Sequence, residues 1–284
     1  MKIAVLSGKG GTGKTFVTVN LASIVKDSIY LDCDVEEPNG HLFFSSSIDS
    51  TKEVTIPIPT FSKDLCNGCR KCVDFCKFNA LSFIKDKPFL FEDICHSCGG
   101  CLLVCPTKAI TEVPKAVGAI EQRTYNTTTC LTGKMALGIS SGVPVIKEVL
   151  KVGNTLAKDN RSIFIDCPPG SACTVNESIA DADYCILVAE PTIFGAHNFA
   201  MVLELARLMK KPIGVILNKC TEENNPTEVL CLKENLHILA KIPYNNALFE
   251  VNSSGGIATE KIPEIKKTFE NIYQTIKKVL EVQS

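Results

Sequence analysis

Short apolar runs alternate with amphipathic stretches along most of the chain. The apolar runs are six to eight residues long and lie at 2–7, 28–34, 162–169, 184–191, 213–219 and 238–243. Runs of this length, bounded by polar residues, are typical of buried strands. Apolar positions with helical spacing lie at 14–26, 143–157, 196–210, 226–235 and 262–281. This alternation predicts an α/β fold, a mostly parallel sheet with helices on both faces.

The alternation is interrupted in the first half of the chain. The sequence PIPTFSK at 57–63 breaks the pattern, a cysteine-rich stretch continues to about residue 114, and 119–137 has the pattern of a hairpin. We therefore expect a discontinuous α/β domain at 1–56 and 115–284, with a small α+β domain inserted at 57–114. A shift of 29 residues lays the four cysteines of CNGCRKCVDFCK onto those of CHSCGGCLLVCP, so the insert is internally duplicated.

Charge and composition narrow the class of protein. The 284 residues include 30 basic and 31 acidic ones, so the whole chain has no field that favours nucleic acid. No apolar run reaches the length of a membrane span, and the first strand begins directly after Met1, which leaves no room for a signal peptide. The last helix has an apolar face but mixed charges on the other, which favours packing over membrane binding. We expect a cytoplasmic protein with no nucleic-acid partner and no stable membrane attachment.

The chain has 15 cysteines, and eight of them are clustered in the insert. In a reducing compartment, clustered cysteines indicate metal ligation rather than disulfides. The other seven are scattered, and packing as small apolar residues is their ordinary role.

A phosphate-binding loop follows the first strand. GKGGTGKT, Gly8 to Thr15, fits the pattern G-x-x-x-x-G-K-[ST] between a strand and a helix. In such a loop backbone N–H groups surround the phosphates at the positive end of the helix. Lys14 would reach the β- and γ-phosphates, and the Thr15 hydroxyl would hold Mg²⁺. The expected nucleotide contacts are Gly8, Lys9, Gly10, Gly11, Thr12, Gly13, Lys14 and Thr15.

The second lysine of this loop, Lys9, resembles the signature of the MinD/ParA family of ATPases, which includes the nitrogenase iron protein. The resemblance implies ATP or ADP bound with Mg²⁺, hydrolysis, and a homodimer on ATP binding in which Lys9 reaches the other subunit's nucleotide. It covers about residues 1–56 and 115–284.

Three further segments carry the same resemblance: LDCDVEEPN, IFIDCPPG and ILNK. The first implies that Asp32 lies near Mg²⁺ and that Asp34 orients the attacking water. The second implies that Asp166 holds Mg²⁺ through water and that Gly170 senses the γ-phosphate, and the third that Asn218 reads adenine. Phosphoryl transfer needs positioning and charge neutralisation above all, so Lys9, Lys14 and Asp34 are the expected catalytic residues.

The insert resembles a bacterial two-cluster ferredoxin, in which the fourth cysteine of each run ligates the other cluster. The resemblance implies two [4Fe–4S] clusters. One would be held by Cys66, Cys69, Cys72 and Cys105, and the other by Cys76, Cys95, Cys98 and Cys101. Zinc is the competing metal, although zinc sites rarely repeat this three-plus-one spacing. Lys77 replaces the usual proline after Cys76, and with Arg70 and Lys71 it makes the first run the more basic, so the two clusters should differ.

The expected function depends on where the cysteine-rich insert joins the ATPase domain. The insert begins about twenty residues after Asp34, beyond the segment where the family's first switch lies. We expect a dimeric ATPase whose nucleotide state gates electron transfer to a partner protein or metallocofactor system. Two alternatives remain open: a maturation factor that carries clusters, and a positioning ATPase that senses redox state. A further cluster at Cys173, with Cys130, is also conceivable, because the nitrogenase iron protein has a ligand at the offset of Cys173 from Asp166.

Overall fold

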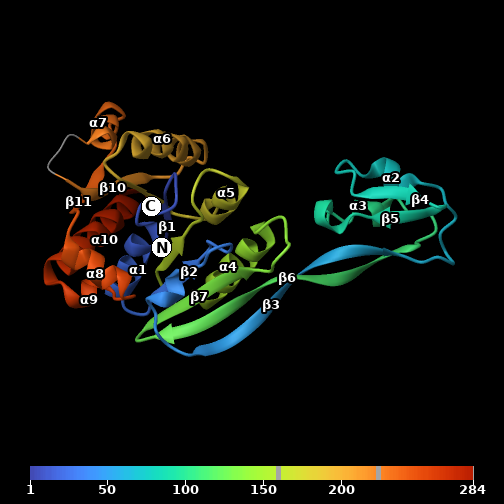
Figure 1. Ribbon diagram of the computed structural model, residues 1–284, viewed down its shortest axis with the longest axis horizontal. Coiled ribbons are helices and arrows are strands. Elements are labelled where there is room, and N and C mark those ends of the chain that lie inside the picture. The colour runs from blue at the N-terminus through green and yellow to red at the C-terminus, as the bar shows by residue number, and fades with distance from the viewer. Residues whose placement is uncertain (158–160, 222–224, 284) are drawn as a thin grey trace.

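The structure, a computed structural model that describes residues 1–157, 161–221 and 225–283, consists of two bodies joined by a long two-stranded arm (Figure 1). The larger body contains the termini and is built on a nine-stranded sheet. The strand order is β11-β10-β9-β1-β8-β2-β7-β6-β3.

Seven strands of this sheet are parallel; six of them coincide with the predicted apolar runs, and one lies in the stretch that was predicted as a hairpin. They are β1 (Lys2–Leu6), β2 (Ile29–Asp32), β7 (Thr128–Met135), β8 (Ile163–Asp166), β9 (Tyr184–Ala189), β10 (Ile213–Cys220) and β11 (Ile238–Pro243). Central strands β2, β8 and β9 are buried along their whole length, because helices cover both faces of the sheet.

Each face of the sheet has its own core. One face is covered by α1 (Lys14–Ile24), the 3-10 turn η1 (Gly40–Leu42), α8 (Asn246–Ser253), α9 (Ala258–Lys261) and α10 (Pro263–Gln283). The other is covered by α4 (Val143–Leu156), α5 (Cys173–Ile179), α6 (Ile193–Leu208) and α7 (Pro226–Lys233). Phe269 and Ile276, on the predicted apolar face of α10, are fully buried. None of the described helices is long and apolar enough to cross a membrane.

The arm consists of β3 (Ile48–Phe61) and β6 (Ile110–Tyr125), which pair antiparallel. The hairpin expected at 119–137 is confirmed as β6 and β7, which pair from Gly118↔Met135 to Tyr125↔Thr128. The expected break at 57–63 is wrong, since β3 continues to Phe61. It tolerates Pro57 and Pro59 because it lies at the edge of the sheet, where an N–H can be missing without loss of a ladder bond.

The smaller body at the far end of the arm contains α2 (Lys71–Phe75), β4 (Leu81–Ile84), β5 (Lys87–Leu90), the 3-10 turn η2 (Glu92–Ile94) and α3 (Gly100–Leu103). Strands β4 and β5 form a separate two-stranded sheet. The expected domain boundaries fall within the arm, where Pro57 and Pro114 are paired in register.

Candidate functional site

The phosphate-binding loop lies between β1 and α1, where the sequence predicts it. Gly11 and Gly13 have positive φ values of 79° and 97°, which only glycine adopts freely. A Cβ on Gly13 would also lie 2.1 Å from Nδ2 of Asn218. The Thr12 hydroxyl is buried and, within the described residues, has no hydrogen-bond partner. Such an orphaned donor in a loop of backbone N–H groups fits a bound phosphate.

A cavity of about 650 Å³ opens beside this loop. Its volume is in the range of small-molecule and cofactor sites. It is lined by the loop and α1 (Ser7, Gly10, Gly11, Gly13, Lys14, Thr15, Phe16), by the segment after β2 (Asp34, Val35, Glu36, Glu37, Asn39, Phe43), by the start of α5 and the segment before it (Pro168, Pro169, Ala172, Thr174), and by Asn252. A nucleotide with its phosphates on the loop would fill this cavity.

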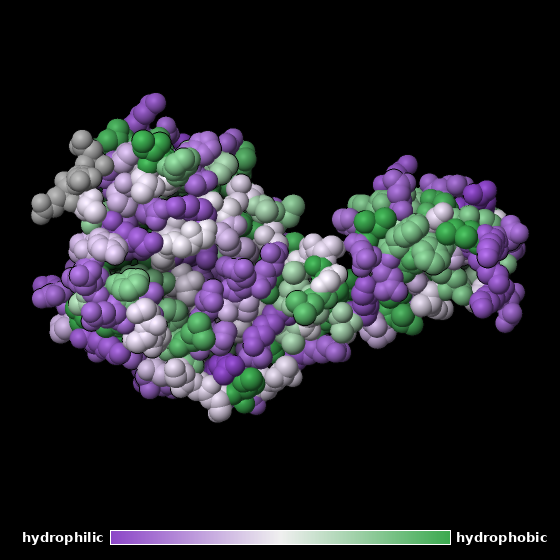
Figure 2. All heavy atoms as spheres, viewed as in Figure 1, coloured by the Kyte–Doolittle hydropathy of each residue, from purple (hydrophilic) through white to green (hydrophobic). Residues whose placement is uncertain are grey.

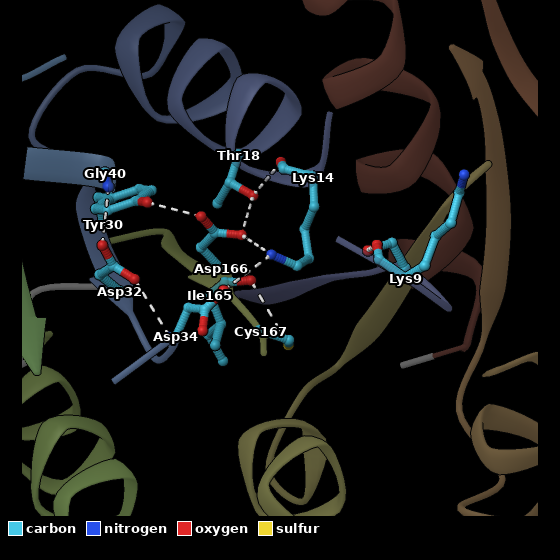
Figure 3. Close-up of polar contacts among 11 residues, drawn as sticks. Lys9, Lys14, Thr18, Tyr30, Asp32, Asp34, Gly40, Ile165, Asp166 and Cys167 are labelled. Atoms are coloured by element: carbon cyan, nitrogen blue, oxygen red, sulfur yellow. Dashed lines mark hydrogen bonds and ion pairs between the residues drawn. The ribbon is translucent and has the colours of Figure 1, made fainter. Parts of the chain in front are cut away.

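Two buried carboxylates lie behind the loop. Asp32 and Asp166 end the adjacent strands β2 and β8 and are paired in register. One oxygen of Asp166 accepts from Lys14 Nζ at 3.3 Å, and the other accepts from the Tyr30 hydroxyl at 2.9 Å (Figure 3). The Thr18 hydroxyl also lies 3.5 Å from the first oxygen. Carboxylates at the carboxyl edge of a parallel sheet, beside a phosphate loop, suit Mg²⁺.

The charges in this site perturb one another. Burial raises the pKa of Asp34 to about 6, although the Lys14 ammonium, 3.8 Å away, opposes the rise. Burial also raises the pKa of Asp32 well above its usual range, reinforced by Asp166. Burial would lower the pKa of Lys14, but Asp166 and Asp34 outweigh it and raise that pKa. The site therefore has several carboxylates around one buried cation, a cluster that a divalent cation would complete.

The segment after β2 is tied to Asp32. The carboxylate of Asp32 accepts from the backbone N–H of Asp34 at 3.2 Å and of Gly40 at 2.9 Å (Figure 3). The structure therefore brings together Lys14, Asp32, Asp34 and Asp166, which the sequence predicts as one site.

Lys9 lies apart from this cluster and points away from it (Figure 3). Its ammonium is paired with Glu190, which follows β9, and Lys219 Nζ lies 3.6 Å from the same carboxylate. Lys219 also donates to the Gly11 carbonyl at 2.6 Å. An intermolecular role for Lys9 stays a prediction and would require the ion pair to break.

Two other predicted residues are occupied by bonds within the chain. The N–H of Gly170 donates to the Ser7 carbonyl at 2.9 Å, and Asn218 Nδ2 donates to the Thr12 carbonyl at 2.8 Å. Their roles with γ-phosphate and adenine stay predictions. The sequence patterns did not predict Tyr30, Glu190 and Lys219 as residues of this site. One signal for Tyr30 was available in the sequence. It lies within an apolar run that predicts a buried strand, and a buried hydroxyl requires a hydrogen-bond partner.

The eight clustered cysteines lie in the smaller body, around two separate hollows. Cys76, Cys95, Cys98 and Cys101 line a cavity of about 270 Å³. Cys66, Cys69, Cys72 and Cys105 line another of only about 20 Å³, so these four thiols must move apart to admit a cluster. Among the described residues, no group of three or more His, Cys, Asp or Glu side chains is close enough to hold a single metal ion.

The remaining cysteines are mostly core residues. Cys33, Cys130, Cys167, Cys185 and Cys231 are buried, as expected of packing residues. Cys173 is exposed at the first turn of α5, whereas Cys130 is buried in β7, and burial raises the pKa of the Cys130 thiol to about 12. This burial speaks against the pairing of Cys173 with Cys130 at a further cluster.

The parallel sheet, the phosphate loop and the buried carboxylates define a P-loop nucleotide-binding protein. A family model described as "CobQ/CobB/MinD/ParA nucleotide binding domain" matches residues 3–256, so the chain belongs to this family.

Two curated relatives come from Methanocaldococcus jannaschii. The uncharacterized protein MJ0579 is 29% identical over 223 residues, 77% of this chain and 80% of its own length. The uncharacterized protein MJ0578 is 28% identical over 284 residues, 99% of this chain and 98% of its own length.

Solved structures share the fold. The cell division ATPase MinD of Pyrococcus furiosus matches with a TM-score of 0.60 and 21% identity over 98% of both chains. The septum site-determining protein MinD of Pyrococcus horikoshii, complexed with Mg-ADP, matches with a TM-score of 0.59 and 19% identity over 100% of this chain and 98% of that one.

Proposed function

We propose that the protein is an ATP-binding and ATP-hydrolysing dimeric switch whose nucleotide state gates electron transfer from two [4Fe–4S] clusters in the smaller body to a partner. The observation that carries the coupling is a continuous set of contacts from the nucleotide cavity to the turn that precedes Cys95.

The nucleotide end of the proposal rests on the larger body. The loop Gly8–Thr15 would bind the phosphates of ATP, and Thr15, Asp32 and Asp166 would hold Mg²⁺. Bound there, the cation neutralises the charge of the phosphates. Lys14 would move from Asp166 to the phosphates, and Asp34, which lines the cavity, would orient the attacking water. Gly170 would exchange its bond with Ser7 for the γ-phosphate, and Asn218 would contact adenine.

The cluster end rests on how the cysteines are grouped. Each hollow is lined by three cysteines of one run and the fourth cysteine of the other, which is the interleaving of a two-cluster ferredoxin. Four thiols around each hollow match the number of ligands that a cluster takes. The hollow of Cys95 has room for such a group, whereas the four thiols of the hollow of Cys66 would have to move apart. Bound there, the clusters would supply one-electron chemistry, and these cysteines would fix their separation.

Contacts connect the two ends through the loop between β7 and α4. Val35 and Thr174 line the nucleotide cavity, and a Cβ on Gly142 would lie 2.5 Å from Val35 Cγ2 and 3.9 Å from Thr174 Cγ2. Gly142 therefore packs against Val35 and lies close to Thr174, two residues that line the nucleotide cavity. Two residues earlier, the Ser140 hydroxyl donates to the Asp93 carbonyl at 3.0 Å.

A lysine of the arm contacts the same turn. Lys115 Nζ, on β6, lies 2.9 Å from a carboxylate oxygen of Glu92 and 3.9 Å from one of Asp93. The turn Glu92–Ile94 leads directly into Cys95. A nucleotide-driven shift of the segment after β2 would therefore reach one of the two cysteine-lined hollows.

The test is a comparison of nucleotide states in protein reconstituted anaerobically with iron and sulfide. We expect about eight iron atoms per chain and two centres of different midpoint potential. Exchange of ADP for a non-hydrolysable ATP analogue should shift at least one potential. A tenfold difference in nucleotide affinity between the two redox states corresponds to about 59 mV for a one-electron couple. Equal potentials and equal transfer rates in both nucleotide states would rule out the gate.

A cluster-carrying maturation factor is the second candidate, and one observation favours it. Cys69 and Cys98, one in each ligand set, are exposed, so both clusters would be accessible to an acceptor. A transfer assay separates the candidates: iron retained by this protein in the presence of an apo-acceptor supports electron transfer, and iron lost to the acceptor supports maturation.

A further inference from the structure

The two hollows lie at different distances along the arm. Pro59 of β3 and Glu112 of β6 line the hollow of Cys95, whereas Phe61 and Ile110 line the hollow of Cys66. Each of the latter lies two residues farther along its strand, about 7 Å at the usual strand rise. The turn before Cys95 also contacts Ser140 of the larger body. The hollow of Cys66 therefore belongs to the outer end of the molecule.

The outer hollow is surrounded by positive charge. Six exposed cations line it or lie within two residues of a lining residue: Lys63, Arg70, Lys71, Lys85, Lys87 and Lys108. The same criterion finds four carboxylates, Asp64, Asp74, Asp86 and Glu112. Around the inner hollow it finds one cation, Lys77, and four carboxylates, Asp74, Glu92, Asp93 and Glu112. The smaller body is therefore polarised, with its positive end outward.

These cations are free to meet a partner. Lys115 is paired with Glu92 at the inner end, but none of the six outer cations has an ion-pair partner among the residues that the structure describes. Arg70 rests over the ring of Phe83 at 5.0 Å, which leaves its charge exposed at the rim of the hollow. Hydrophilic residues form the outer edge of this body in Figure 2.

Exposed apolar side chains lie next to residues that line the same hollow. Leu65, directly before Cys66, is 54% exposed; Ile84, beside Phe83, is 47% exposed; and Phe89, beside Pro88, is 50% exposed. An apolar centre within a charged rim is the usual anatomy of a protein–protein interface, and the charge of the rim selects the partner.

We propose that this basic outer end, defined by Lys63, Leu65, Arg70, Lys71, Ile84, Lys85, Lys87 and Lys108, is the docking surface for a small acidic electron-transfer protein. The inference rests on the proposed function and names the partner's chemistry. A protein is favoured over nucleic acid because four carboxylates lie among the six cations beside the cysteine-lined hollow, a mixed-charge rim typical of protein interfaces, whereas single-stranded nucleic acid is bound in a positively charged groove.

The test uses a flavodoxin of strongly negative net charge as the probe, and the full chain with and without reconstituted iron. Charge reversal at three exposed positions, Lys63→Glu, Lys71→Glu and Lys87→Glu, should weaken flavodoxin binding at least tenfold at low ionic strength. Binding by the unmodified chain should weaken as salt is added, and cytochrome c, a basic redox protein, should not bind.

A matched control changes the net charge equally elsewhere. Lys266→Glu, Lys267→Glu and Lys278→Glu replace three exposed lysines of α10, on the larger body. This variant should bind flavodoxin within twofold of the unmodified chain. Equal losses in the two triple variants, or a flavodoxin affinity independent of salt, would overturn the docking surface. Tighter binding of short single-stranded DNA or of anionic vesicles, lost only in the outer variant, would also overturn it by assigning the surface to that ligand.

The outcome is separable from the proposed function. Flavodoxin binding depends on surface charge and is measured by calorimetry, so it is scored whether or not iron is retained. Failure to retain iron would contradict the proposed function alone. Retained iron with nucleotide-dependent potentials, but no charge-dependent binding, would contradict the docking surface alone.

Discussion

The hydroxyl of Tyr30 reaches the buried end of the nucleotide site. It is fully buried and donates to Asp166 at 2.9 Å, on the oxygen opposite the one that Lys14 contacts. It also packs on Gly40, whose N–H donates to Asp32. Tyr30 is therefore a positioning residue that fixes the orientation of one carboxylate and supports the backbone that binds the other.

Removal of this hydroxyl should weaken Mg²⁺ binding with little effect on the fold. Tyr30→Phe deletes one hydrogen bond to a charged group, about 1.5 kcal/mol, so the Mg²⁺ concentration that half-saturates fluorescent-nucleotide binding should rise roughly tenfold. Tyr184→Phe is the control, because Tyr184 is also buried in the core on the same face of the sheet but lies away from the carboxylates. An unchanged Mg²⁺ requirement in Tyr30→Phe would contradict the positioning role.

Lys9 is paired with Glu190 of its own chain, so it is not available to reach the nucleotide of the other subunit in the proposed dimer. Glu190→Gln removes the charge that retains Lys9 in each of the two subunits. ATP-dependent dimerisation should therefore strengthen roughly 25-fold, the equivalent of about 1 kcal/mol for each of two partly exposed ion pairs. Sedimentation equilibrium with a non-hydrolysable ATP analogue measures this. Lys9→Ala combined with Glu190→Gln should lose the gain. A dimer weakened by Glu190→Gln alone would show that the glutamate serves the interface directly.

At the scale of elements, the sequence is most informative where a single principle decides the structure. The strand–loop–helix unit around Gly8–Thr15 requires positive φ values at Gly11 and Gly13, and the structure has them. Six of the seven parallel strands follow from the apolar runs, whereas β7 was predicted only as part of the hairpin at 119–137. The arm was not predicted, because Pro57 and Pro59 break a central strand but are tolerated at an edge, and edge position is a property of the whole sheet.

Part of the candidate site, like part of the fold, was predictable from the sequence. The grouping of Lys14, Asp32, Asp34 and Asp166 follows from strand ends that meet at one edge of a sheet. The bonds of Lys9 with Glu190 and of Asn218 with Thr12 were not predictable, because they join segments far apart in the sequence.

The base of the arm contains an ion-pair cluster that should make stability depend on acid. Glu121 of β6 accepts from Lys134 Nζ at 2.7 Å and from Arg123 Nη2 at 2.8 Å. Burial raises the pKa of Glu121, but its bonds with Lys134 and Arg123 outweigh this and lower that pKa below 4.5. The folded state therefore gains stability from ionised Glu121 above pH 4.5 and loses it as the pH falls through the lowered pKa.

Glu121→Gln should accordingly lower the free energy of unfolding at pH 7 by roughly 1 kcal/mol. The difference from the unmodified chain should shrink below pH 4.5, where the native carboxylate becomes protonated. Urea denaturation at both pH values measures this. Glu53→Gln, at an exposed position of the neighbouring strand β3, should leave the free energy of unfolding unchanged at pH 7 and below pH 4.5. A deficit in Glu121→Gln that stays constant with pH would indicate lost packing instead.

At the scale of the whole molecule, the proposed coupling would pass through the arm and the loop between β7 and α4, whose residues contact the turn before Cys95 in the described part of the chain. Ser140→Ala with Lys115→Ala removes the Ser140 hydrogen bond and the two Lys115 ion pairs on the turn before Cys95. The difference in midpoint potential between the ADP and ATP-analogue states should therefore disappear, while iron content and ATP hydrolysis persist. Arg207→Ala, which breaks a comparable exposed ion pair with Glu234 near the opposite edge of the sheet, should leave the difference intact. The coupling is the difference in midpoint potential between the ADP and ATP-analogue states, so it is measured within each variant. A general loss of stability that affects both nucleotide states equally does not change this difference. Nucleotide-dependent potentials that survive the double substitution would place the coupling elsewhere, in the pairing of the arm strands or in the dimer.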